Sequence, residues 1–462
     1  MYGWGNRQEN SRSGLGFKIG AGVAILAGMK IELSNVTSLA RAVLVSTAIL
    51  FVTGAGANQH PDAPDKPIPA ISQRINAFTI DFLKHAAAKD TGNLILSPQS
   101  IYHGVAMSYV ASGTKTRTEL AKAVGFPDDD KQLTTDLAKL RKQIQSTVNK
   151  NTDVSIANSA WLDSTVAEFR KDYLSNLEKT FEASMYPVKF KNSKEASGRI
   201  NKWVSEKTRS RISEVVRPQD FDSPDFTPCL VTVNVAYFKS EWSVPFEKAD
   251  TKERPFRLNE KDAVNALLMH RVVHSRYGED KTFQFLELPY VDSTYSMYVL
   301  LPKQVLVPKK MVSLVQSNTL AKLSDHAVQR SVDVLLPKFE MRSHCSAKDT
   351  LSKMGVALAF DMNRADFDRM IVKNPAVDRV FLSEIYHDAW VAADEKGTEA
   401  AAATTTIVAA PACAPPTREE PPAVFHADHP FLFFIVHNES RSILFAGLVA
   451  NPKQLGGDSK PK

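Results

Sequence analysis

The sequence predicts an α+β fold, with helices concentrated in the first third of the folded region and strands in the rest. Three observations support this prediction. Apolar residues recur at helical spacing between residues 71 and 148, apolar or alternating runs typical of strands dominate from 229 to 449, and no strand–helix–strand unit repeats. The chain has 462 residues, of which 43% are hydrophobic, so it can bury a large core.

An apolar run near the N-terminus predicts a secretory signal. Residues 42–52 (AVLVSTAILFV) are too few to cross a bilayer as a helix, which takes about 20 residues. Lys30 and Arg41 precede the run and small residues follow it at 53–57, which is the layout of a cleavable signal. We therefore expect a secreted, extracellular protein that keeps no membrane segment after the signal is removed. An uncleaved signal anchor is the alternative.

This pattern also predicts the domain boundaries. Cleavage is expected after Ala57, and a start at Met29 rather than Met1 would give a signal of ordinary length. The predicted segments are a signal region at 1–57, a proline-rich linker at 58–70, one folded domain at 71–453 and a flexible tail at 454–462.

Six segments have the apolar spacing of helices. In the first, Ile71, Ile75, Phe78 and Phe82 share one face, and the second follows a Ser-Pro turn and ends at Gly113. The predicted helices are 71–88, 98–113, 116–124, 133–148, 168–181 and 197–212.

The strand predictions depend on continuous or alternating apolar runs. Residues 229–242 (CLVTVNVAYFKSEW) form a near-continuous run, which is typical of a strand buried on both faces. The run that begins at 331 alternates and is interrupted by Pro337. The predicted strands are 93–96, 154–163, 185–190, 229–242, 283–290, 295–302, 331–341, 432–437 and 442–449.

Composition and motifs exclude several functional classes. The net charge is +6, with 57 basic and 51 acidic residues interspersed, so nucleic acid is not an expected partner. The three cysteines, at 229, 345 and 413, form no C-x-x-C pair, zinc pattern or disulfide framework. No nucleophile elbow, zinc-protease motif or phosphate-binding loop occurs. We therefore expect no enzyme activity, no metal and no cofactor.

Seven stretches give the chain a resemblance to a known family. They are NLILSPQSI (93–101), TVNVAYFKSEW (232–242), FKSEWSVPFEKADTKERPF (238–256), LPKFEM (336–341), DEKGTEAAAAT (394–404), DHPFLFFI (428–435) and ILFAGLVANP (443–452). In this order they resemble the serpins, a family of serine protease inhibitors, over about residues 70–452. The resemblance implies three β-sheets, eight or nine helices and an exposed reactive-centre loop, here about 395–425.

The resemblance assigns the alanine-rich stretch after residue 394 to the hinge of that loop. In serpins a protease cleaves the loop and becomes acylated, and the freed segment inserts as a new strand into the largest sheet. Small residues at 400–403 would let the sheet open without overpacking, and Gly397 would give the hinge backbone freedom. If Thr398 enters first, the even-numbered residues point into the core. The hinge residues are Glu395, Lys396, Gly397, Thr398, Glu399, Ala400, Ala401, Ala402 and Ala403.

The resemblance also implies which residues control the opening of the sheet. Four match the family's shutter, a buried polar cluster whose hydrogen bonds would hold the sheet closed. Trp242 and Lys338 match the breach at the end of the sheet where the loop enters, and Lys338 is expected to pair with Glu395. The shutter residues are Ser97, Ser100, Asn234 and His387.

The position of the scissile bond stays open. The family's spacing of about seventeen residues from Glu395 reaches Pro411, which is unfavourable before a scissile bond. Cleavage at Ala412–Cys413 would suit an elastase, and Cys413–Ala414 is a close alternative. Arg418–Glu419 would suit a trypsin-like protease, although it lies beyond the usual place.

Two further sites depend on secretion. Asn438 begins an N-glycosylation sequon in a predicted hairpin turn. The helix at 133–148 carries Lys139, Arg141 and Lys142 among acidic and neutral residues. A solvated face is the favoured interpretation of this helix, and weak glycosaminoglycan binding is the alternative.

We expect a monomeric inhibitor that forms a covalent acyl complex with an elastase-like or chymotrypsin-like serine protease and acts once. The alternative is a non-inhibitory serpin acting as carrier, chaperone or protease substrate. Small residues at 400–404 favour inhibition. The long proline-rich loop favours the alternative, because excess length can let the protease escape.

Overall fold

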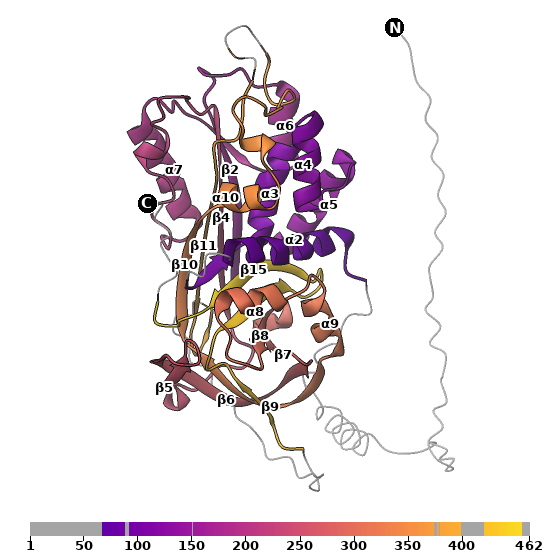
Figure 1. Ribbon diagram of the computed structural model, residues 1–462, viewed down its shortest axis with the longest axis vertical. Helices are drawn as coiled ribbons and strands as arrows, with labels where there is room; N and C mark the ends of the chain where they lie inside the picture. The colour runs from indigo at the N-terminus through magenta and orange to yellow at the C-terminus, as the bar shows by residue number, and fades with distance from the viewer. Residues whose placement is uncertain are drawn as a thin grey trace, which may run out of the picture. The chain divides into compact units, whose positions relative to one another are not determined.

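The computed structural model describes residues 67–87, 92–149, 151–373, 377, 379–398 and 420–454, all within the folded unit Ala63–Lys462 (Figure 1). The predicted signal region, most of the linker, most of the reactive-centre loop and the tail beyond residue 454 lie outside the described residues.

Nine α-helices occur in the described part of the chain. They are α2 (Ala70–Ala86), α3 (Pro98–Tyr109), α4 (Thr114–Val124), α5 (Asp130–Gln145), α6 (Lys171–Lys179), α7 (Ser193–Lys207), α8 (Pro308–Leu314), α9 (Thr319–His326) and α10 (Ala347–Lys353). The hydroxyl of Ser97 caps α3 by accepting a hydrogen bond from the Ser100 N–H at 3.3 Å, with Pro98 in the first turn. α4 ends at Gly125, whose φ of 76° lies in the left-handed region that favours glycine.

A six-stranded sheet contains the predicted site. Its strands, in spatial order, are β10 (Phe339–Ser346), β11 (Ile385–Ala393), β12 (Gly397–Thr398), β4 (Leu230–Glu241), β2 (Thr152–Leu162) and β3 (Ser184–Pro187). β4 is buried on both faces, as its continuous apolar run predicts. Val233 and Val235 pack with α7 on one face, whereas Ala236 and Phe238 join the main core on the face that α3 covers (Figure 1).

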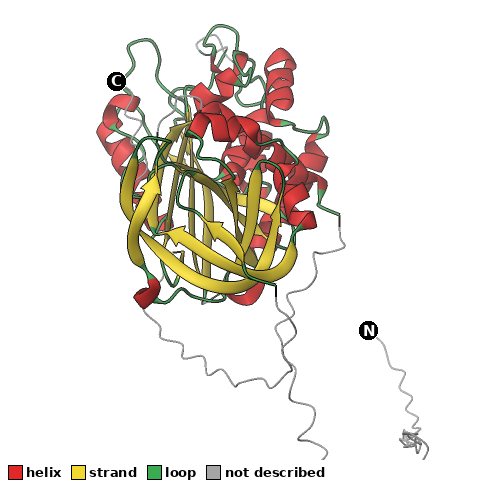
Figure 2. Ribbon diagram, turned by 60° about the horizontal axis from the view of Figure 1, so that its bottom comes forward, coloured by secondary structure: helices red, strands yellow, loops and turns green. Residues whose placement is uncertain are grey.

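The remaining strands form a nine-stranded, strongly curved sheet (Figure 2). Its order is β1 (Leu94–Leu96), β15 (Ser442–Val449), β14 (Phe431–His437), β8 (Tyr295–Pro302), β7 (Phe283–Pro289), β6 (Ala263–Glu279), β9 (Val328–Pro337) and β13 (Ala423–His426), and β5 (Lys252–Arg257) pairs with β6. β6 is 17 residues long and pairs with β7 only at its C-terminal end, while β5 and β9 pair with the rest. β6 therefore links its neighbours into one continuous sheet. The described residues form two hydrogen-bonded sheets, where the resemblance implies three, because β6 belongs to two of those three.

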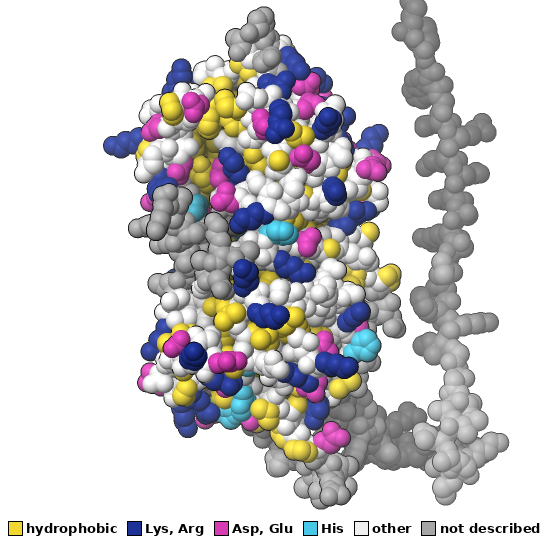
Figure 3. Space-filling view, viewed as in Figure 1, with side chains coloured by type: hydrophobic (Ala, Val, Ile, Leu, Met, Phe, Trp, Pro, Cys, Tyr) yellow, Lys and Arg dark blue, Asp and Glu magenta, His cyan; other side chains and the backbone are white. Residues whose placement is uncertain are grey.

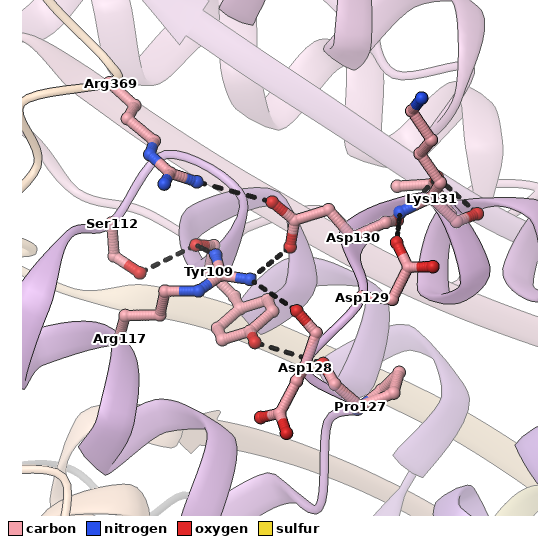
Figure 4. Close-up of polar contacts among 10 residues, drawn as sticks. Tyr109, Ser112, Arg117, Pro127, Asp128, Asp129, Asp130, Lys131 and Arg369 are labelled. Carbon is pink, nitrogen blue, oxygen red and sulfur yellow. Dashed lines mark hydrogen bonds and ion pairs between the residues drawn. The ribbon is translucent and has the colours of Figure 1, made fainter.

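One arginine holds the connection between α4 and α5 (Figure 4). Arg117 donates to the Tyr109 carbonyl oxygen at 3.2 Å, and its guanidinium lies 3.9 Å from the centroid of the Tyr109 ring. Arg117 also forms an ion pair with Asp130, and Arg369 reaches the other oxygen of that carboxylate at 3.4 Å. Because Asp130 is the first residue of α5, these contacts fix where α5 begins.

Candidate functional site

The hinge lies inside the six-stranded sheet. After β11 the chain turns back as β12, so that Gly397 pairs with Glu241 of β4. Thr398 pairs with Ser240 of β4 on one side and with Ala393 of β11 on the other, both antiparallel. The first two residues of a new strand are therefore already seated between β4 and β11.

Beyond β12 the sheet is closed. β4 and β11 pair directly with each other, in parallel, from Thr232–Ile385 to Tyr237–Trp390. The rings of Tyr237 and Trp390 stack at this last pair, with centroids 6.2 Å apart and planes 13° apart. The sheet is thus split at one end and paired along the rest.

Glycine is required at position 397 because the backbone of β4 lies very close to it. A Cβ atom at this position would lie 2.2 Å from the Ser240 carbonyl oxygen and 2.6 Å from the Glu241 Cα. The glycines of the described residues with positive φ are Gly92, Gly125 and Gly355, so Gly397 is not one of them. In this structure the missing side chain of Gly397 therefore allows close contact with β4, whereas the sequence predicted that this glycine provides backbone freedom.

Thr398 is held by a tyrosine that the sequence did not single out. Its side chain is fully buried, and its hydroxyl lies 2.7 Å from the Tyr290 hydroxyl. Tyr290 in turn stacks on Trp242, with centroids 4.6 Å apart and planes 10° apart. The breach tryptophan thus positions the hinge through Tyr290.

Backbone hydrogen bonds hold the residues just before Gly397. The Trp242 N–H donates to the Lys396 carbonyl at 2.8 Å, and the Phe246 N–H donates to the Glu395 carbonyl at 2.7 Å. The indole N–H of Trp242 donates to the Asp394 carbonyl at 2.9 Å. The Asp394 carboxylate accepts hydrogen bonds from the N–H groups of Lys396 and Gly397, which closes the turn.

Lys338 and Glu395 form the pair that the resemblance implies. The Lys338 Nζ lies 2.8 Å from the Glu395 Oε2, with the glutamate side chain 7% exposed and the lysine side chain 34% exposed. Burial alone would raise the pKa of the Glu395 carboxyl, but the hydrogen bonds from Lys338 and from the backbone outweigh it and lower the pKa. The pair ties the hinge to the start of β10.

Two of the shutter residues are joined directly. The Ser97 N–H donates to the His387 Nε2 at 2.9 Å, so this nitrogen is an acceptor and the Nδ1 carries the proton. Burial lowers the pKa of His387 to about 3, which keeps the ring neutral. Ser100, the third residue, donates its N–H to the capping hydroxyl of Ser97, while its own buried hydroxyl has no partner among the described residues.

The side chain of Asn234 bonds to β2 rather than to the side chains of the other shutter residues. Its side-chain amide donates to the Asn158 Oδ1 at 2.6 Å, which links the two strands. Its own Oδ1 has no hydrogen-bond partner in the described part of the chain. A Cβ atom at Gly104 of α3 would lie only 2.5 Å from this oxygen. His387 is the register partner of Asn234 across the β4–β11 ladder. Asn158 is a member of this cluster that no sequence pattern indicated.

Several predicted residues lie outside the described residues. They are Glu399, Ala400, Ala401, Ala402 and Ala403 of the hinge, and the scissile-bond candidates Ala412, Cys413, Ala414, Arg418 and Glu419.

Asn438 is placed in a tight turn. Its Nδ2 donates to the Ser293 carbonyl and to the Ser296 hydroxyl, each at 2.9 Å. A glycan attached to this nitrogen would displace at least one of these hydrogen bonds. Glycosylation of Asn438 therefore stays a prediction, and it would leave the Nδ2 one N–H for these two acceptors.

The described residues contain no group of three or more His, Cys, Asp or Glu side chains that could hold a metal. In the same residues, no helix has the length and apolarity that a membrane crossing requires. Cys229 is a buried free thiol, and burial raises its pKa to about 12, so it stays protonated. On the face shown in Figure 3, basic and acidic side chains are interspersed.

The comparison with protein families agrees with the resemblance that the sequence showed. The model described as serpin (serine protease inhibitor) matches residues 73–452. This chain is a serpin. An uncharacterized serpin-like protein of Methanosarcina acetivorans is 34% identical over 386 residues, which cover 82% of this chain and 85% of the relative. A leukocyte elastase inhibitor of Xenopus laevis is 33% identical over 390 residues, which cover 83% of this serpin and 99% of the relative.

Solved structures share the fold of this serpin. Tengpin, a thermophilic serpin in its native state, has a TM-score of 0.74 at 23% identity, covering 84% of this chain and 95% of that one. Thyroxine-binding globulin in complex with thyroxine has a TM-score of 0.71 at 23% identity, covering 83% of this chain and 100% of that one. At these identities the likeness shows the fold alone.

The pairing of β12 in this serpin shows what a longer strand at this place would require. Residues added to β12 beyond Thr398 in the same direction would have to lie between β4 and β11, where these two strands now pair directly. Each new pair in that direction requires one existing β4–β11 pair to separate.

Proposed function

We propose that the protein is a secreted, monomeric inhibitor of an elastase-like or chymotrypsin-like serine protease, acting once through loop cleavage and strand insertion. The observation that carries this proposal is the seating of Gly397 and Thr398 between β4 and β11. An insertion that has already begun lowers the barrier to the next step, because the sheet is parted where the loop must enter.

The chemistry belongs to the protease. Its serine oxygen attacks the carbonyl carbon of the scissile bond, the peptide C–N bond breaks, and the leaving amine takes the proton. The acyl-enzyme remains attached to the loop, which is then free to extend β12. Insertion moves the tethered protease before water can hydrolyse the ester.

The composition of the hinge supports insertion. Thr398 faces the interior, and strand alternation would direct Ala400 and Ala402 to the same side. Small side chains there can enter a packed sheet with little overpacking cost. The leukocyte elastase inhibitor among the relatives supports a small-residue specificity, and the apolar run at 42–52 supports secretion.

The test uses protein lacking residues 1–57, mixed at equal molarity with an elastase, a chymotrypsin or a trypsin. A complex that survives boiling in detergent is expected with at least one of them. The mass of the released C-terminal peptide would identify the scissile bond among the candidates. As a matched control, Thr398→Arg places a charge at the buried entry position and should be cleaved without forming a complex.

The alternative function is that of a carrier or a protease substrate, which the proline-rich length of the loop favours. Cleavage by every protease without a stable complex, and without any rise in thermal stability, would support this alternative and rule out inhibition. A rise in stability without a complex would mean that the loop inserts but the true target differs.

Weak polyanion binding is a subsidiary proposal. Lys139, Lys142 and Lys179 line a shallow hollow of about 370 Å³ between α5 and the end of α6. Arg141 does not join them, because it is 9% exposed and pairs with Glu182.

Heparin chromatography tests this hollow. Replacing its three lysines with alanine should lower the salt needed for elution, since each removed contact reduces counterion release. Replacing the exposed Lys248, Lys252 and Lys261 serves as the matched control. Equal effects of the two triple variants would rule out a specific site.

A further inference from the structure

One buried arginine has no counter-ion in the described part of the chain. Arg271 lies at an inward-facing position of β6 and is 9% exposed. Its Nε and Nη1 are shielded from water and have no hydrogen-bond partner among the described residues. An unpaired charge in a protein interior is costly, so buried charges are normally paired with an opposite charge. The environment of Arg271 is therefore incomplete without an anion.

The guanidinium of Arg271 keeps its charge at neutral pH. Burial lowers the pKa of this side chain to about 9, and no neighbouring carboxylate raises the pKa again. A carboxylate within about 4–6 Å would favour the charged form and raise the pKa. A group with a pKa of about 9 is still protonated at pH 7, so the interior holds a full positive charge here.

The carboxylates of the neighbouring strands are engaged elsewhere. Asp333 of β9 stands opposite the residue that follows Arg271, so its side chain lies on the other face of the sheet. There the Asp333 Oδ1 lies 2.7 Å from the His270 Nε2. On β7, the Glu287 Oε2 lies 3.2 Å from the Arg276 Nη1. Neither strand therefore supplies a counter-ion to Arg271.

One edge of β6 is unpaired beside Arg271. β5 pairs with β6 as far as Leu268, and β7 pairs with it from Tyr277 onward (Figure 1). Between these two points β6 pairs with β9 alone. No backbone hydrogen bond outside that ladder reaches residues 269–274 within the described ranges. Backbone N–H groups at this edge are therefore available as further donors to an anion.

A phenylalanine ring covers one face of the guanidinium. The Arg271 guanidinium carbon lies 4.3 Å from the centroid of the Phe246 ring, and Phe246 is 3% exposed. The ring attracts the cation through its negative face but offers no acceptor to the N–H groups in the guanidinium plane. The ring thus leaves the edge of the guanidinium free and adds an apolar surface next to it.

We propose that Arg271 binds a free monocarboxylate of about the size of acetate, with its oxygens against the guanidinium edge and its apolar end against Phe246. The planar N–H donors of a guanidinium match the two oxygens of a carboxylate. One negative charge balances the one unpaired positive charge, whereas a second would have no cation to meet it. This site does not depend on the proposed inhibitory function, because it needs neither cleavage nor insertion of the loop.

Binding is tested on the uncleaved full chain by NMR of the arginine Nε–H groups. Sodium acetate replaces sodium chloride at constant ionic strength, and acetamide in constant chloride is the neutral probe of the same shape. Acetate should shift the Arg271 signal saturably. It should bind about 5–30-fold more tightly than acetamide, because hydrogen bonds between charged groups are stronger than those to a neutral acceptor.

Thermal unfolding of two variants gives a second readout. In chloride, Arg271→Met removes the unpaired charge and should raise the Tm above that of the wild type. Saturating acetate should raise the Tm of the wild type by more than that of this variant, because only the wild type has the site. Arg254→Met is the matched control, since Arg254 lies in the same sheet on β5 at a more exposed position. Acetate should stabilise this control as much as the wild type.

Arg271→Lys provides a further test if Arg271→Met fails to fold. Lysine keeps the positive charge but lacks the planar pair of donors, so acetate should stabilise this variant less than the wild type. Equal stabilisation of the wild type and an Arg271 variant by acetate would overturn the site.

Two NMR outcomes would also overturn the site. One is no saturable shift of the Arg271 signal up to about 100 mM acetate, which would mean that water alone meets the charge. The other is equal binding of acetate and acetamide, which would mean that the charge of the ligand is not recognised.

Discussion

The Ser240 carbonyl oxygen lies 2.2 Å from the point where Gly397 would carry a Cβ atom, so β4 accepts only glycine at this position of the hinge. Gly397→Ala should therefore expel β12 from the sheet or force β4 to move. Overpacking of this kind typically costs about 1–3 kcal/mol in the free energy of unfolding. The fluorescence of Trp242, whose N–H bonds to Lys396, should report the expulsion.

Gly198 offers a matched control for that substitution. It lies in α7, where a Cβ would meet no atom within 4 Å. Gly198→Ala should be neutral or stabilise by about 0.5–1 kcal/mol. A Gly397→Ala variant with wild-type stability and fluorescence would contradict the close contact.

Tyr290→Phe should loosen the hinge while leaving the aromatic stack on Trp242 intact. It removes the hydroxyl that lies 2.7 Å from the buried Thr398 hydroxyl, at a cost of about 1–3 kcal/mol for the unsatisfied group. Faster proteolysis near residue 398 should follow. Tyr295→Phe is the control, because its hydroxyl bonds to Thr147, away from the hinge. Equal proteolysis of both variants would show that the hydrogen bond does not hold the hinge.

The Lys338–Glu395 pair predicts an acid-sensitive contribution to stability. The folded-state pKa of Glu395 is lowered, so its contribution is present above the unfolded value near 4.5 and is lost as pH falls through the folded value. Glu395→Gln should destabilise the protein at pH 7 and flatten the stability profile below about pH 5. Urea denaturation between pH 3 and 7 measures this, with Glu260→Gln at an exposed position as the matched control. A parallel profile for Glu395→Gln and wild type would refute the pairing.

The burial of His387 predicts a second effect of pH on stability, over a different pH range. Its folded pKa of about 3 lies below the ordinary value of 6.5, so its contribution is complete above pH 6.5 and declines as pH falls toward 3. His387→Gln keeps an acceptor for the Ser97 N–H and should reduce the slope of unfolding free energy by up to about 1.4 kcal/mol per pH unit. In NMR spectra of the native protein, the His387 ring should stay neutral down to about pH 4. Protonation near pH 6.5 would contradict its burial beside Ser97.

The sequence predicted the strands whose apolar pattern is simple and missed the others. The run at 229–242 is β4, buried on both faces. No prediction covered β6, because its alternating burial changes phase at Leu268 and Met269, which are both buried, and a buried position is taken by Arg271, whose guanidinium lies 4.3 Å from the centroid of the Phe246 ring. β5, α8 and α9 were also missed.

The site residues, too, fall into those that the sequence predicted and those that it missed. Glu395, Gly397 and Trp242 could be found because they stand in a recognisable order along the chain. Asn158 and Tyr290 could not, because their roles come from cross-strand register and from stacking between distant segments. Nothing in the local sequence of either residue encodes those neighbours.

The closed part of the six-stranded sheet has a thermodynamic consequence. Six consecutive residue pairs, from Ile385–Thr232 to Trp390–Tyr237, join β11 to β4 through a single ladder. A strand placed between them would exchange that one ladder for two, and each added hydrogen bond contributes about 0.5–1.5 kcal/mol. If the proposed insertion occurs, this form of the fold is therefore not the one of lowest free energy, and its lifetime would be set by how often the Trp390–Tyr237 pair separates.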